Sequence, residues 1–172
     1  MVYQPREDSY LLVGEVEKRA RGRVLDMGTG TGVQSLAALQ KTSVNSVTSV
    51  DKDPSAVKFV KKMGLDCLES DLFENVEGKF DFIVFNPPYL PDDPKVKDIA
   101  LDGGPNGNDL LFRFLEQCPE YLNDNGEVLF VQSSITGLDK TEEKLSDLGF
   151  QYSIVARQKI PWEELVVFSC KL

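Results

Sequence analysis

The tetrapeptide Asn86-Pro87-Pro88-Tyr89 carries residue types that can hold a planar NH2 group. The Asn86 side-chain oxygen and the Pro87 carbonyl could each accept one hydrogen of such a group, while the Tyr89 ring stacks on its flat face. Two prolines fix φ and keep the preceding residue extended, so the Asn86 amide would be held rigidly. A proline-rich turn without function would show the same residues, so the neighbouring sequence has to decide.

A glycine-rich turn lies upstream, where the apolar segment 23–27 runs into Gly28-Thr29-Gly30-Thr31-Gly32. Glycines permit positive φ and let a ligand approach the backbone. A dinucleotide fingerprint needs a further glycine at position 33, which is valine, and the Gly-Lys-Ser/Thr ending of a phosphate loop is also missing. The turn therefore favours a nucleoside without a pyrophosphate, with a purely structural turn as the alternative.

Acidic residues follow the next two apolar segments. Asp51 directly follows the segment 47–50. In nucleotide-binding βαβ units, the acid that binds the ribose hydroxyls lies at about this distance after the glycine-rich turn. Asp71 follows residues 65–70. Asn86 follows the apolar run 80–85, which is typical of a buried parallel strand. These positions predict a βαβ series with polar groups at the carboxyl ends of its strands, where open α/β sheets bind ligands.

Strands and helices that could position these residues alternate to the end of the chain. We expect a helix at about 33–39, a helix through Leu111, Leu115, Cys118 and Leu122, a turn at 123–126, a strand at 127–132, a helix at 139–148 and a final hairpin around 159–162. The segment 90–108 is long and polar, which is typical of a lid or binding loop, with an inserted loop as the alternative. Its part 91–97 matches no pattern.

The ordered motifs resemble class I S-adenosylmethionine-dependent methyltransferases that methylate amino groups. The opening residues 2–12, VYQPREDSYLL, narrow the resemblance to the HemK-like protein glutamine methyltransferases, in the short archaeal and eukaryotic branch. That branch modifies the Gly-Gly-Gln glutamine of class I translation release factors. The segment 103–107 with Arg113-Phe114 resembles the same branch, and the similarity covers nearly the whole chain. Bacterial members carry an extra amino-terminal helical domain, for which the few residues before Asp26 leave no room.

The resemblance implies an α/β class I methyltransferase (Rossmann-like) fold in one domain over residues 1–172. Its mostly parallel seven-stranded sheet would carry helices on both faces and an antiparallel carboxyl-terminal hairpin. It also implies S-adenosylmethionine as cofactor, S-adenosylhomocysteine as product and no metal. The implied cofactor-binding residues are Ser9, Asp26, Gly28, Gly30, Asp51, Asp71, Leu72 and Asn86, and the implied catalytic residues are Asn86, Pro87 and Tyr89.

Within that set, the family pattern assigns Asp51 to the ribose and Asp71 with Leu72 to the adenine. Asp26 and Gly28 would serve the methionine end, and Asp26 stands where several members have glutamate. The pattern also implies a small zinc-binding activator subunit, forming a heterodimer. Sheets of this class usually place the third strand at an edge, here about 65–69, where apolar Leu65, Cys67 and Leu68 would invite another chain.

The composition and charge of the chain exclude several classes of function. The chain has no histidine, which excludes Ser-His-Asp and Cys-His catalysis and every histidine-containing metal site. The formal charge of −9 argues against direct nucleic-acid binding and favours a basic or protein substrate. The one basic cluster, at Lys18, Arg19, Arg21 and Arg23, is expected to close the first helix, with a nucleic-acid contact as the alternative.

The three cysteines Cys67, Cys118 and Cys170 lie far apart in apolar runs, so we expect buried thiols in a reducing compartment. No basic, apolar leader and no run of membrane-spanning length is seen, which predicts a cytoplasmic protein without membrane contact. Two other functions remain open at this point. One is methylation of the exocyclic amine of adenine in DNA or RNA, and the other is a catalytically silent binding protein with the same fold.

Overall fold

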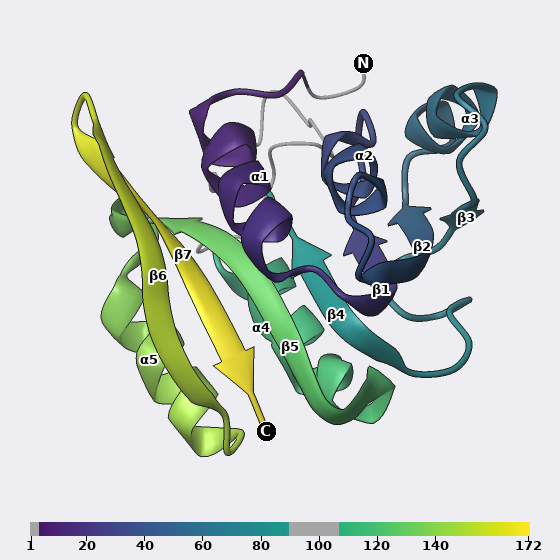
Figure 1. Cartoon of the computed structure of the whole chain (residues 1–172). Coiled ribbons are helices and arrows are strands. Elements are labelled where there is room, and N and C mark those ends of the chain that lie inside the picture. The colour runs from purple at the N-terminus through teal and green to yellow at the C-terminus, as the bar shows by residue number, and fades with distance from the viewer. Residues whose placement is uncertain (1–3, 90–106) are drawn as a thin grey trace.

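The computed structural model describes residues 4–89 and 107–172 (Figure 1). Helices and strands alternate along most of the described chain, as the sequence predicted, but the third and fourth strands, and the last two strands, follow one another without a helix between them. The elements are α1 Glu7–Arg19, β1 Gly22–Met27, α2 Val33–Leu39, β2 Val44–Asp51, α3 Pro54–Lys62, β3 Cys67–Glu69, β4 Phe80–Phe85, α4 Asp109–Gln117, β5 Leu122–Ser133, α5 Leu138–Asp147, β6 Gln151–Ile160 and β7 Glu163–Lys171. Two short 3-10 turns, η1 Cys118–Tyr121 and η2 Ser134–Thr136, flank β5.

Within the described residues these strands form one seven-stranded sheet in the order β3-β2-β1-β4-β5-β7-β6. β1 to β5 pair in parallel, while β7 lies antiparallel between β5 and β6. The strand order reverses between β1 and β4, which makes the crevice above their carboxyl ends the expected ligand site. This sheet confirms the fold class expected from the sequence, including the terminal hairpin.

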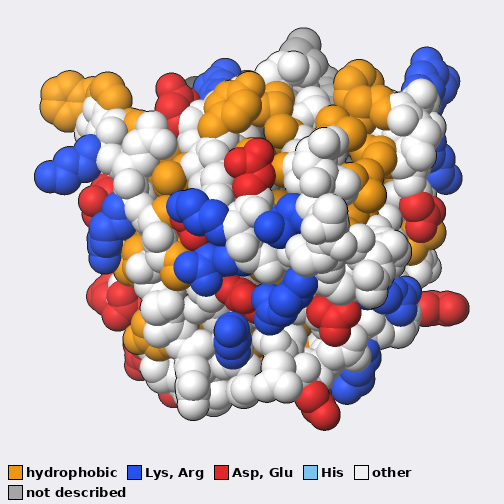
Figure 2. Space-filling model, viewed as in Figure 1, with side chains coloured by type: hydrophobic (Ala, Val, Ile, Leu, Met, Phe, Trp, Pro, Cys, Tyr) orange, Lys and Arg blue, Asp and Glu red, His pale blue; other side chains and the backbone are white. Residues whose placement is uncertain are grey.

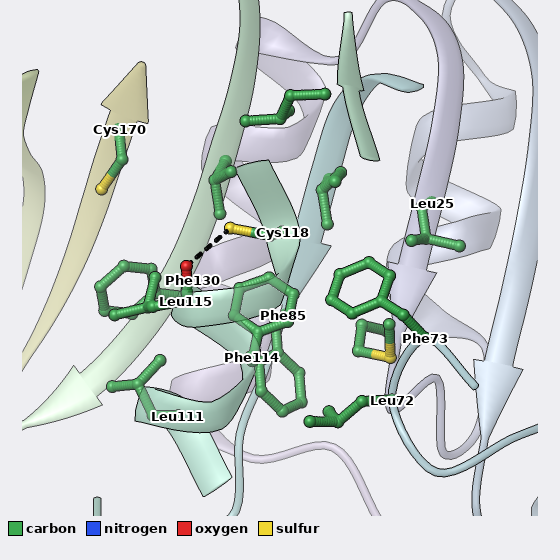
Figure 3. Packing of buried hydrophobic residues seen from close by; sticks show 14 of the residues in the cluster. Leu25, Leu72, Phe73, Phe85, Leu111, Phe114, Leu115, Cys118, Phe130 and Cys170 are labelled. Atoms are coloured by element: carbon green, nitrogen blue, oxygen red, sulfur yellow. Dashed lines mark hydrogen bonds between the residues drawn. The ribbon is translucent and has the colours of Figure 1, made fainter. Parts of the chain in front are cut away.

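Alternate side chains of the central strands serve the two faces of the sheet. Val24, Phe82 and Val84 are buried under α1 and α2, which lie in front of the sheet in Figure 1. Ile83 and Phe85 are buried on the other face under α4 and α5. On that face the Phe85 and Phe114 ring centroids are 4.6 Å apart, and Figure 3 shows these rings within the apolar cluster. The apolar side chains on both faces of β4 are therefore buried, as its continuous apolar sequence indicated.

Two expectations for the segment after α4 were wrong. Leu122 begins β5 instead of ending a helix, because Pro119 lies in η1 and cannot continue the helical hydrogen bonds. The expected turn at 123–126 lies inside β5, where Phe80 pairs with Leu122 but Phe82 pairs with Glu127. Residues 123–126 thus lie opposite Asp81 alone, so β5 carries three extra residues that form an irregularity of the strand, and Asn125 adopts a positive φ of 61° there.

The third strand is confirmed as an edge strand, but it is shorter than expected, because β3 spans Cys67–Glu69 and leaves Leu65 outside. The helix expected at 139–148 begins and ends one residue earlier, as α5 Leu138–Asp147. The three cysteines are buried free thiols, as predicted. Residues 90–106 of the lid expected at 90–108 lie outside the described residues, and they include the segment 91–97.

The basic cluster does not close the first helix as a unit. Lys18 and Arg19 lie in the last turn of α1, but Arg23 lies in β1, with its guanidinium 4.4 Å from the centre of the Phe80 ring. Arg19 and Arg21 both pair with the buried carboxylate of Glu127, at 3.2 and 2.9 Å. Most of this cluster is therefore used in internal contacts. In the part of the chain that the structure describes, no helix is both long and apolar enough to cross a membrane.

Candidate functional site

Asn86 follows β4 directly and contacts the first turn of α1, 78 residues earlier in the chain. Its side-chain Nδ2 donates to Oδ2 of Asp8 at 3.3 Å and to Oγ of Ser9 at 3.2 Å. Asp8 and Ser9 are only 3% and 2% exposed. The amide of Asn86 is thus held from its nitrogen end, against the amino-terminal end of a helix.

The position of α1 follows from its sequence. Leu12 and Val16 are buried one turn apart and pack the helix on the sheet, while Glu7 and Asp8 put negative charge in the first turn, where the helix dipole favours it. Gln34 on α2 donates from Nε2 to the carbonyl of Ser9 at 3.0 Å. The two helices therefore fix the residues that contact Asn86.

Asp26 lies in β1 just before the glycine-rich turn and is 1% exposed. Its Oδ2 accepts three hydrogen bonds, from Oγ of Thr29 at 2.7 Å and from the hydroxyl and backbone N–H of Ser35 at 2.6 and 3.0 Å. Its Oδ1 is buried with no hydrogen-bond partner in the described chain. Burial raises the pKa of Asp26 to about 6, although the donors on Oδ2 act in the opposite direction.

The glycine-rich turn and the end of β2 are joined directly. Oδ2 of Asp51 accepts the backbone N–H of Gly30 at 2.8 Å, and its Oδ1 accepts that of Asp53 at 2.9 Å. Burial raises the pKa of Asp51, while these backbone donors oppose that shift. A Cβ on Gly28, whose φ is +62°, would lie 3.1 Å from the Phe85 ring, so this position needs glycine for both reasons.

Asp71 and Leu72 follow β3 and are joined to the rest of the site through the backbone, because Ser70 N–H donates to the carbonyl of Asp51 at 3.0 Å. Leu72 has a positive φ of 50° and is buried in the core. The Asp71 carboxylate has two cationic partners, Lys52 at 3.5 Å and Arg113 at 3.3 Å. The sequence did not indicate that this acid would be shared with cations.

Tyr89, at the end of the tetrapeptide, is half-buried. Burial raises the pKa of its hydroxyl to about 12, and the nearby carboxylates of Asp8 and Glu163 act in the same direction. Gly107 lies against its backbone, since a Cβ on Gly107 would come within 2.7 Å of the Tyr89 carbonyl oxygen. Asn108 fixes Gly107 in turn, with its Nδ2 donating to the Thr136 carbonyl at 2.6 Å.

The structure brings three expected groups together: Ser9 with Asn86, Asp51 with Gly30, and Asp26 with the turn that contains Gly28. Asp71 and Leu72 lie beside Asp51 through the backbone only. Sequence reasoning gave no role to Asp8, Ser35 or Gly107. Asp8 could have been found as the acid next to Ser9 in the first turn of a helix, whereas no local pattern links Gly107 to Tyr89.

The family model and the similar proteins both relate the chain to methyltransferases. The methyltransferase small domain family matches residues 6–160. A Methanocaldococcus jannaschii protein, whose name proposes protein N5-glutamine methyltransferase activity, is 44% identical over 98% of this chain and 90% of its own length. The release factor glutamine methyltransferase of Agrobacterium fabrum is 34% identical over 73% of this chain, but this match spans only 52% of the bacterial enzyme.

A similar solved structure is the E. cuniculi Mtq2-Trm112 complex, described as responsible for methylation of the eRF1 translation termination factor. It superposes with a TM-score of 0.83 at 26% sequence identity, covering 98% of this chain and 97% of that one. A ribosomal protein L11 methylase of Lactobacillus delbrueckii, with a TM-score of 0.73 at 22% identity, shares the fold.

Proposed function

Because the chain belongs to the methyltransferase small domain family, within which it is similar to protein glutamine methyltransferases, we propose that it methylates a protein glutamine. The methyl group passes from S-adenosylmethionine to the side-chain amide nitrogen, and the target is the Gly-Gly-Gln glutamine of a class I translation release factor. The observation that carries this proposal is the held amide of Asn86, whose nitrogen faces Asp8 and Ser9. Its oxygen is thereby the end available to an incoming NH2 group.

The cofactor fits the residues at the glycine-rich turn. S-adenosylmethionine carries an ammonium group. The buried Oδ1 of Asp26, which has no hydrogen-bond partner among the described residues, is an acceptor that such a cation would satisfy. Gly28 and Gly30 leave the backbone open on the same turn, with φ of 62° and 55°. Asp51 would hold the ribose, and Asp71 with Leu72 the adenine.

When bound, S-adenosylmethionine supplies an electrophilic methyl group on its sulfonium. The part of the protein is positioning, because an amide nitrogen is a poor nucleophile and the chain has no histidine to activate it. Oδ1 of Asn86 and the carbonyl of Pro87 would each accept one hydrogen of the substrate NH2, and Tyr89 would stack on its plane. These acceptors become stronger partners as the nitrogen gains positive charge, which favours the transition state.

We further infer that a small zinc-binding activator subunit binds at the β3 edge. Leu36 on α2, Phe59 on α3 and Met63 just after α3 are about two-fifths exposed. Met63 also packs with Leu65 against the start of α2 near Gly32. Figure 2 shows hydrophobic side chains gathered over this part of the molecule. An edge strand flanked by exposed apolar side chains is suited to a partner that adds a strand. Because release factors work on ribosomes, we place the heterodimer in the cytoplasm.

The test of this function is methyl transfer from labelled cofactor by the chain co-expressed with the activator. Three substrates are compared: a release factor, the same factor with its Gly-Gly-Gln glutamine changed to alanine, and adenine-containing DNA and RNA. We expect label only in the unaltered release factor. Label in nucleic acid would instead indicate an adenine methyltransferase. If neither the release factor nor the nucleic acid is labelled although the chain still binds the cofactor, the chain would be a silent binding protein.

A further inference from the structure

Asp8 is a buried carboxylate with a contact that the proposed reaction does not by itself require. It lies in the first turn of α1 and is 3% exposed, in a position where the helix dipole stabilises negative charge. Its Oδ1 accepts the backbone N–H and the hydroxyl of Ser9, at 2.7 and 3.3 Å. Its Oδ2 accepts Nδ2 of Asn86 at 3.3 Å.

The chemistry of these partners fixes which end of the Asn86 amide faces α1. An ionised carboxylate can only accept hydrogen bonds, so the NH2 end must face Asp8. The second hydrogen of that NH2 group is within reach of Oγ of Ser9, at 3.2 Å. Both hydrogens of Asn86 are then used inside the protein, and the group left to meet a ligand is Oδ1, which accepts.

The reversed amide would be unfavourable at both ends. Its oxygen would lie against the Asp8 carboxylate, which places two acceptors in contact without a proton between them. Its NH2 group would face the NH2 group of a substrate, which places two donors in contact. Ser9 alone cannot prevent this reversal, because a hydroxyl donates or accepts as its partner requires.

We propose that Asp8 is a positioning residue that sets the polarity of the Asn86 amide and so makes Asn86 an acceptor for the substrate NH2 group. The inference rests on the proposed function, which gives Asn86 its role. It adds that the acceptor end of Asn86 is chosen by a carboxylate on α1, and that the acid at position 8 and the amide at position 86 work as a pair.

The test exchanges the two side chains. Asp8→Asn keeps the size of residue 8 but can offer either oxygen or NH2, so Asn86 is no longer oriented and kcat should fall at least about tenfold. The KM for the protein substrate and the affinity for S-adenosylhomocysteine by calorimetry should stay within about twofold. Asp147→Asn, at an exposed site at the end of α5, is the matched control and should leave all three unchanged.

The double variant separates orientation from simple loss of charge. Asn86→Asp alone sets two carboxylates against each other and should be nearly inactive. In Asp8→Asn/Asn86→Asp, the new amide can donate to the new carboxylate, which keeps an acceptor oxygen for the substrate. Its kcat should exceed that of Asn86→Asp at least about tenfold. A double variant no more active than Asn86→Asp, or an Asp8→Asn variant with unchanged kcat, would overturn the proposal.

Side-chain amide exchange tests the same contact without any substrate. The NH2 protons of Asn86, assigned by their loss in Asn86→Ala, should exchange with water at least about ten times more slowly in the unaltered chain than in Asp8→Asn. Equal rates would overturn the proposal, even if no release factor is methylated and the proposed function fails. If Asp8→Asn does not fold, the double variant should fold again, and its failure to do so would also overturn the proposal.

Discussion

Ser35 donates twice to one oxygen of Asp26, with its hydroxyl at 2.6 Å and its backbone N–H at 3.0 Å. The Ser35 hydroxyl also lies 2.7 Å from that of Ser49 on β2, so the contact ties α2 to two strands. Thr29 donates to the same oxygen. Oδ2 of Asp26 is thus saturated, and Oδ1 alone is left for a cofactor.

Ser35→Ala should destabilise the fold by about 1.5–3 kcal/mol, because it removes a buried hydrogen bond to a carboxylate and leaves Ser49 without that partner. Urea unfolding at pH 7, with the slope of the transition unchanged, measures the loss. Ser55→Ala, at an exposed position on α3, is the control and should change stability by less than about 0.5 kcal/mol. Equal stability of the two variants would contradict the role of Ser35.

The raised pKa of Asp26 predicts a specific pH dependence. Its folded pKa of about 6 lies above the ordinary 3.8, so the folded state holds the proton more strongly between these values. The stability that this group contributes is therefore present below about pH 4 and is lost as the pH rises through 6, by about 3 kcal/mol in total. The lowered pKa values of Glu127 and Asp81 act in the opposite sense, being stabilising above about pH 4.

Asp26→Asn isolates this contribution, since the other carboxylates are common to both proteins. The stability of the unaltered chain relative to Asp26→Asn should decline from pH 4 to pH 7 in denaturant unfolding. The same variant should bind S-adenosylhomocysteine more weakly at pH 7, because it puts an NH2 group where an acceptor is needed. A relative stability that does not vary with pH, or unchanged affinity, would speak against this assignment.

Asp51→Ala should weaken cofactor binding by about 1.5–3 kcal/mol through the loss of charge-assisted hydrogen bonds to the ribose. Part of the effect comes from the turn, since Gly30 loses its partner on Asp51. Calorimetric titration with S-adenosylhomocysteine measures the change. Asp66→Ala, at an exposed site, is the control and should leave the affinity unchanged. An unchanged affinity in Asp51→Ala would contradict the assignment of Asp51 to the ribose.

Gly107→Ala should lower turnover by displacing the Tyr89 backbone. The variant combines the strain of a φ of +77° with a clash, because the new Cβ would lie 2.7 Å from the Tyr89 carbonyl oxygen. Gly149→Ala is a matched control, since its φ is +81° but no atom of residues 4–89 and 107–172 lies within 4 Å of the new Cβ. Gly149→Ala should lose about 1 kcal/mol of stability and Gly107→Ala more because of the clash, and only Gly107→Ala should also lose kcat. Equal kcat in the two variants would contradict the role of Gly107.

Leu65→Lys and Leu68→Lys, at and just before β3, should prevent binding of the activator subunit, because each places a charge in an apolar contact. Size-exclusion chromatography after co-expression detects the heterodimer. Leu172→Lys is the control, since Leu172 is 59% exposed at the end of the chain, beyond β7. A heterodimer that survives both changes, or one that never forms with the unaltered chain, would refute docking at this edge.

Much of this fold could be predicted because the decisive patterns are local. The apolar run of β4 and the glycine turn that opens α2 predicted both elements with the bounds the structure gives. Leu122 was misplaced because its spacing continues that of α4, and the pattern does not register that Pro119 ends the helix. The contact between Asp8 and Asn86 joins residues 78 positions apart, so no periodicity could reveal it.

Methylation of a release factor by the Asn86→Ala variant tests the central claim most directly. The unaltered heterodimer should add one methyl group to the Gly-Gly-Gln glutamine, seen by mass spectrometry of the peptide that contains it. Asn86→Ala should fold, bind S-adenosylhomocysteine only modestly more weakly and lose nearly all turnover, on the order of 100-fold or more, because positioning supplies most of the rate. Near-normal methylation of that glutamine by Asn86→Ala would contradict the account.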